Sequence, residues 1–113
     1  MLFYFGEEMK NCTNLNEVRV EIDLLDEQII ALLAQREGYV LQAAKFKRDE
    51  DAVKAPDRVE QVIQKVRHKA QMHGANPEIV EVVYRNMIQA FIAQELSEHK
   101  RIADATQCKS PKS

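Results

Sequence analysis

Two basic residues lie at helical positions where apolar side chains are expected. From Leu15 to Phe46 the apolar residues recur in alternating steps of three and four, the pattern of a helix packed along others, and Arg36 occupies one of these positions. A buried guanidinium needs an anionic partner. Lys47 follows three helical turns later, so on one continuous helix the two cations share a face with their backbones roughly 16 Å apart. The spacing predicts a pocket in which both side chains bind one small anion.

A third cation, Arg19, lies too far along the same helix to join that pocket from the same chain. It precedes Arg36 by seventeen residues, which places it roughly 25 Å away along the axis and about 100° around it. One small molecule therefore cannot contact both arginines from a single straight helix. If Arg19 serves the same pocket, a second copy of the chain must supply it.

Two further charged residues complete the candidate pocket. Glu95 falls at or near the apolar face of the last predicted helix, and Arg58 stands at the beginning of the second. Arginine pairs bidentately with carboxylates and phosphates. The three glycines are scattered and form no phosphate-binding loop, so the favoured ligand is a small molecule with more than one carboxylate.

The sequence gives little support for nucleophilic or metal chemistry. No serine, threonine or cysteine stands in a recognisable arrangement with a histidine and an acid, and His68, His73 and His99 are expected at helix surfaces or ends without metal-ligand spacing. A pocket that binds an anion and directs hydrogen-bond donors suits a reaction driven by conformational restraint and electrostatic stabilisation. We expect no cofactor and no metal.

Three helices are expected to carry these residues, which makes the chain all-α. They are predicted over residues 14–48, 57–73 and 78 to about 102, with Gly74 and Asn76-Pro77 between the last two. The first helix would be roughly 50 Å long, whereas a compact domain of this size is only ~26 Å across. We therefore expect either that other copies of the chain cover its apolar side or that the helix breaks.

Length and composition fit one globular domain. The chain has 113 residues, and its formal net charge of −2 disfavours a general nucleic-acid surface. We expect an N-terminal extension over residues 1–13, a helical domain over 14–103 and a disordered tail over 104–113. Neither an export signal nor a membrane-spanning stretch is evident, so we expect a cytoplasmic protein with Cys12 and Cys108 reduced.

Several segments resemble a known family, the all-helical chorismate mutases, and in particular its small stand-alone branch, which also includes isochorismate pyruvate lyase. The segments that carry the resemblance are 15–26, 32–36, 44–47, 55–59 and 74–96. The resemblance implies an intertwined homodimer, a helical bundle with two equivalent sites, each of which takes one arginine from the other subunit. It also implies a cofactor-free reaction on a small dicarboxylate.

The resemblance assigns a role to each charged residue. Arg36 and the partner's Arg19 would hold the two substrate carboxylates. Lys47 would donate to a carboxylate and to the ether oxygen, while Arg58 would assist at the ring side. Glu95 stands where many members have Gln, facing the ether oxygen, and it must carry a proton to donate.

Two apolar positions bear on the choice of substrate. Val59 stands where several mutases have a Glu that contacts the ring hydroxyl. Phe91 stands where some mutases have a Ser. Both changes resemble the lyase branch. Glu95, however, differs from the Gln expected in the lyase. Chorismate mutase is our first interpretation and isochorismate pyruvate lyase the alternative. A non-catalytic helical dimer or a metabolite-sensing domain is a third hypothesis, and it needs no cationic pocket.

Overall fold

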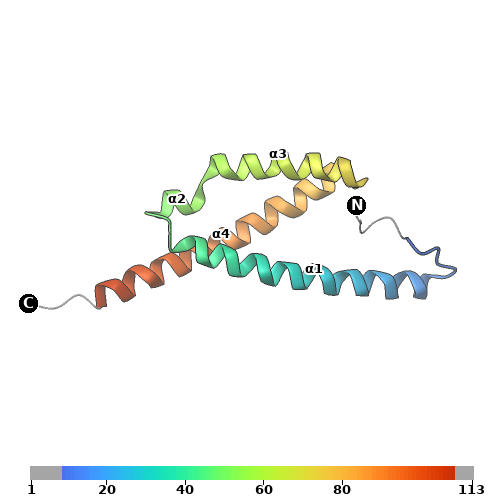
Figure 1. Cartoon of the computed structure of the whole chain (residues 1–113), viewed down its shortest axis with the longest axis horizontal. Helices are drawn as coiled ribbons and strands as arrows, with labels where there is room; N and C mark the ends of the chain where they lie inside the picture. The colour runs from blue at the N-terminus through green and yellow to red at the C-terminus, as the bar shows by residue number, and fades with distance from the viewer. Residues whose placement is uncertain (1–8, 109–113) are drawn as a thin grey trace, which may run out of the picture. The chain divides into compact units, whose positions relative to one another are not determined.

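Helices make up most of the chain that the computed structural model describes, residues 9–108. α1 spans Leu15–Ala44, α2 Glu50–Lys54, α3 Pro56–His73 and α4 Pro77–Cys108 (Figure 1). No strand occurs within the described range, which confirms the predicted all-α fold with a long first helix. The chain divides into two units, residues 1–36 and 37–113, and the boundary between them falls inside α1.

Side chains at the first turn define the start of α1. The side-chain oxygen of Asn14 accepts a hydrogen bond from the backbone N–H of Glu17 at 2.9 Å. The Glu17 carboxylate in turn accepts one from the backbone N–H of Thr13 at 3.0 Å. These reciprocal bonds satisfy donors that a helix start leaves open, which confirms the start predicted at Asn14.

The apolar side chains of α1 are largely uncovered in the single chain. Four of them, Leu15, Leu25, Ile29 and Leu32, are from 53% to 61% exposed, although their spacing predicts a packed face. The one residue of α1 that is fully buried is Ala44, in its last turn. Such a run of exposed leucine and isoleucine is typical of an interaction surface.

α1 ends earlier than the sequence predicted. The prediction placed its end near Arg48. In the structure the chain after Ala44 makes three hydrogen bonds of the i to i−3 type, from the N–H groups of residues 45–47 to the carbonyls of residues 42–44. Asp49 then caps α2, because its side chain accepts from the N–H of Ala52 at 2.9 Å. Lys47 therefore lies after the end of α1. The prediction that Arg36 and Lys47 share one face of a continuous helix was wrong.

The junctions around α3 follow the local signals in the sequence. Ala55 adopts a left-handed conformation with φ 35° between α2 and α3, and Pro56 opens α3 as predicted. Gly74 ends α3 with φ 76°, its N–H directed at the carbonyls of Ala70 and Gln71. Asn76 then caps α4 through a 2.9 Å bond from the N–H of Glu78.

α4 turns back from the end of α3 and packs along α3 and α2 (Figure 1). Ile63 and Ala70 of α3 and Ile88 of α4 are buried and form part of the apolar core of this unit. The last helix was expected to end near residue 102, before a disordered tail. Instead α4 continues to Cys108, because residues 103–106 contain good helix formers and no breaker precedes Pro111. The remainder of that expected tail, residues 109–113, lies outside the described residues, as do residues 1–8 of the expected N-terminal extension.

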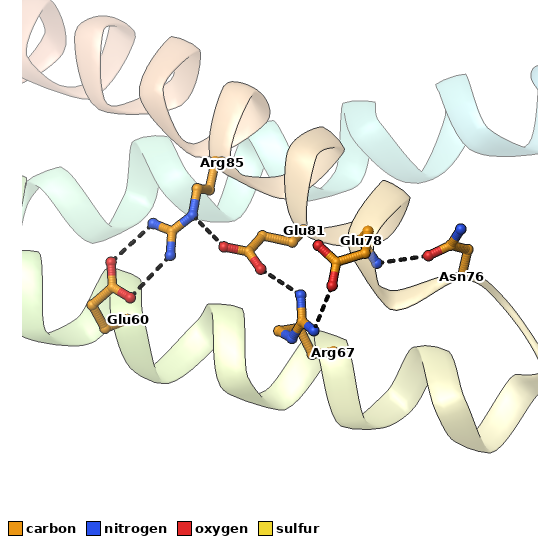
Figure 2. A network of polar contacts seen from close by, with 6 residues as sticks. All are labelled: Glu60, Arg67, Asn76, Glu78, Glu81 and Arg85. Atoms are coloured by element: carbon orange, nitrogen blue, oxygen red, sulfur yellow. Dashed lines mark hydrogen bonds and ion pairs between the residues drawn. The ribbon is translucent and has the colours of Figure 1, made fainter.

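A row of ion pairs joins the facing sides of α3 and α4 (Figure 2). Arg85 binds both oxygens of Glu60, at 2.9 and 3.0 Å, and its Nε donates to Glu81 at 2.7 Å. Arg67 donates to the other oxygen of Glu81 at 2.6 Å and to Glu78 at 3.0 Å. The hydrogen bonds from Arg85 and then Arg67 hold the pKa of Glu81 below its ordinary value, and Arg85 does the same for the pKa of Glu60.

Candidate active site

The second unit brings two of the predicted site residues into direct contact. Lys47 Nζ lies 2.7 Å from Glu95 Oε2, and the side chains are 28% and 5% exposed. Glu95 is therefore buried on α4, as the helical pattern predicted. The approach of the ammonium is not aligned as a hydrogen bond, and among residues 9–108 no other donor satisfies this buried oxygen. A buried carboxyl oxygen without an aligned donor is rare in folded proteins, and here the Lys47 ammonium is its ion-pair partner.

His99 holds the backbone of Lys47. Its Nε2 lies 2.8 Å from the carbonyl oxygen of Lys47, and since a carbonyl only accepts, this ring nitrogen carries the hydrogen. Sequence reasoning missed this role and expected His99 at a helix surface or end. One signal was present: His99 follows Glu95 by four residues, so the two share a face of α4.

A second contact ties the last turns of α1 to α4. The amide nitrogen of Gln94 donates to the carboxylate of Glu37 at 2.5 Å. Gln94 precedes the buried Glu95, and Glu37 lies two turns before the end of α1 at Ala44. Both residues were missed from the sequence, because neither occupies a position of the apolar pattern. The contact fixes the part of α1 from which the chain continues to Lys47.

The other predicted residues of this unit lie on α3 and α4. Arg58 is exposed in the first turn of α3, next to the partly buried Val59. Phe91 is partly buried on α4, one turn before Glu95 and on the same face. No contact of Arg58 with the Lys47–Glu95 pair occurs among the described residues, so the structure does not bring all of the predicted residues of this unit together.

An open groove of about 730 Å³ lies between α2, α3 and α4, with Val59 in its wall. The charges of its lining residues balance, because Asp51 and Glu60 are negative and Lys54 and Arg85 are positive. Arg85 is already engaged by carboxylates, so the groove presents no surplus of positive charge to a dianion. The Lys47–Glu95 pair lies outside it and is the better candidate for chemistry.

The first unit carries the two remaining arginines. Arg19 is exposed and Arg36 partly buried, both on the same uninterrupted helix. Their separation of roughly 25 Å along the axis therefore holds in the structure. Neither arginine can be moved closer to the other without breaking α1.

The comparisons with known proteins define the family. Residues 18–96 match the family model for chorismate mutase type II, a range that contains every site residue predicted from the sequence. The chain belongs to the type II chorismate mutase family. It is also 32% identical over 87 residues to the isochorismate pyruvate lyase of Pseudomonas aeruginosa, an alignment that covers 77% of this chain and 86% of that protein. Within residues 9–108, no helix combines the length and apolar character needed to cross a membrane.

Proposed function

We propose that this protein is a chorismate mutase, which rearranges chorismate to prephenate without a cofactor. The observation that carries the proposal is the contact of Lys47 with the buried Glu95, inside the segment that matches the family model. The Lys47 ammonium is one donor to the ether oxygen, and the Glu95 carboxyl 2.7 Å away is the second when it carries a proton.

The chemistry is a concerted [3,3] shift with no covalent enzyme intermediate. As the carbon–oxygen bond of the ether breaks, negative charge grows on the oxygen. The Lys47 ammonium and a protonated Glu95 donate to that oxygen, so they bind the transition state more strongly than the ground state. The ion pair of the substrate-free chain keeps Lys47 at this position until a substrate carboxylate competes for it.

The two substrate carboxylates are assigned to Arg36 and to Arg19 of the partner subunit, with Arg58 at the ring side. The continuous α1 supports this division, because it keeps the two arginines of one chain roughly 25 Å apart. The exposed leucines and isoleucines of α1 support a second copy, which would cover them and form an intertwined homodimer.

Isochorismate pyruvate lyase is the second candidate, and its reaction would use the same charged residues to make salicylate and pyruvate. The relative of that name at 32% identity favours it. The apolar Val59 also favours it, since that position offers no carboxylate to a ring hydroxyl. A non-catalytic helical protein is the third candidate, because Lys47 is already paired with an acid of the protein itself.

The test is a direct assay of the purified protein with chorismate and, separately, with isochorismate. Formation of prephenate supports the mutase, formation of salicylate and pyruvate supports the lyase, and inactivity on both supports the non-catalytic alternative. Lys47→Met removes the ammonium and is expected to lower turnover ~100- to 1000-fold. Lys45→Met makes the same change at an exposed position of the same turn and should leave turnover unchanged. Equal effects of the two substitutions would refute the role of Lys47.

A further inference from the structure

His99 is a residue with a defined contact that the family assignments above do not use. Its ring reaches from α4 to the carbonyl of Lys47, over 52 residues of sequence. The ring is partly buried, so this hydrogen bond competes with water less than a bond on an open surface would.

The backbone of Lys47 depends on this contact because no helix holds it. α1 has ended at Ala44, and the N–H of Lys47 reaches the Ala44 carbonyl at a long 3.4 Å. The shorter bond, 2.8 Å, is the one that His99 donates to the Lys47 carbonyl. The position of the Lys47 backbone is therefore decided by α4 more than by α1.

The same helix also fixes the other end of this residue. Glu95 contacts the Lys47 ammonium at 2.7 Å, and His99 lies one turn further along the same face of α4. α4 thus holds Lys47 at both its backbone and its side-chain nitrogen. When substrate displaces Glu95 from the ammonium, the His99 bond is the shorter of the two backbone contacts that still hold Lys47, the other being the 3.4 Å bond to Ala44.

We propose that His99 is a positioning residue for the reaction, one that sets the place of the Lys47 ammonium through the Lys47 carbonyl and does not touch the substrate. The inference rests on the proposed function of Lys47 as the donor to the ether oxygen. Misplacing a reacting group by about 1 Å lowers the rate by up to ~100-fold. Loss of the His99 donor should therefore act on kcat more than on KM.

The experiment replaces His99 by two residues that carry the same amide group on side chains of different length, glutamine and asparagine. The nitrogen of a glutamine can occupy the place of histidine Nε2, whereas that of an asparagine is too short to reach the carbonyl. His99→Gln should keep kcat within about threefold of wild type, while His99→Asn and His99→Leu should lower kcat roughly 10- to 100-fold with little change in KM. His68→Leu, at an exposed position of α3, is the matched control and should leave kcat unchanged.

A double substitution separates positioning from a general structural effect. If His99 acts through Lys47, His99→Asn should lower kcat no further in a Lys47→Met background. Equal losses in His99→Gln and His99→Asn, or a full additional loss in that background, would overturn the proposal even if His99→Leu fails to fold. A wild-type protein inactive on both chorismate and isochorismate would instead refute the proposed function and the role of His99 with it.

Discussion

A site shared between two subunits predicts that two inactive variants restore each other's activity. Arg19→Ala and Arg36→Ala each remove one arginine that the proposed site assigns to a substrate carboxylate. Hydrogen bonds to charged groups are worth about 1.5–3 kcal/mol, so each variant should lose ~10- to 150-fold in kcat/KM. The two arginines lie on one continuous helix, so neither variant can repair its own site.

The expected recovery follows from the symmetry of the proposed dimer. When equal amounts of the two variants are unfolded together and refolded, roughly half of the dimers contain one chain of each kind. In a mixed dimer one site has both arginines and the other has neither. Roughly one site in four is therefore intact, and the mixture should recover about a quarter of wild-type activity.

The assay is the initial rate of chorismate consumption, with native mass spectrometry to measure the fraction of mixed dimers. A mixture of Arg36→Ala with Lys47→Met is the matched control, because these two residues belong to the same half of a site and no intact site can form. Mixed dimers without recovered activity would refute the shared site. Recovery in the control mixture would show that the arginine and the lysine come from different chains.

Three further predictions concern Glu95 and the stability of the fold. Glu95→Gln keeps a neutral donor and should retain activity within about tenfold, whereas Glu95→Leu should lose ~100- to 1000-fold in kcat, and equal losses would count against a donor role. Gly74→Ala places a methyl group at φ 76° where no atom lies within 4 Å of the new Cβ. Urea unfolding should therefore show a free energy of unfolding lower by about 1 kcal/mol, from backbone strain alone. Ala55→Gly relieves the same kind of strain at φ 35° and should raise the free energy of unfolding by up to about 1 kcal/mol. The pKa values of Glu60 and Glu81 lie below their ordinary value of 4.5 in the folded chain, so the stability they contribute is present above about pH 4.5 and is lost as the pH falls through the lower folded-state values. Urea unfolding of wild type and of Arg85→Met should therefore differ more at pH 7 than in acid, and a difference that does not shrink as the pH falls would contradict this account.

Much of the fold could be predicted from the sequence because helix ends are decided within a few residues. Asn14 with Glu17, Gly74, and Asn76 with Pro77 each satisfy or terminate backbone bonds locally, and the structure has helix ends at these places. Apolar periodicity likewise placed Glu95 on the buried face of α4, since a residue's side of a helix depends only on its register.

The surroundings of Lys47 were decided by the tertiary structure alone. Apolar spacing continues through Phe46, so it predicted a first helix that runs past Ala44, and it did not predict a short helix capped by Asp49. The contacts that hold Lys47 come from Glu95 and His99, about fifty residues away, and such pairs form only when α4 folds back. Periodicity reports which side of a helix a residue occupies, but which residues meet across helices depends on how the chain turns between them.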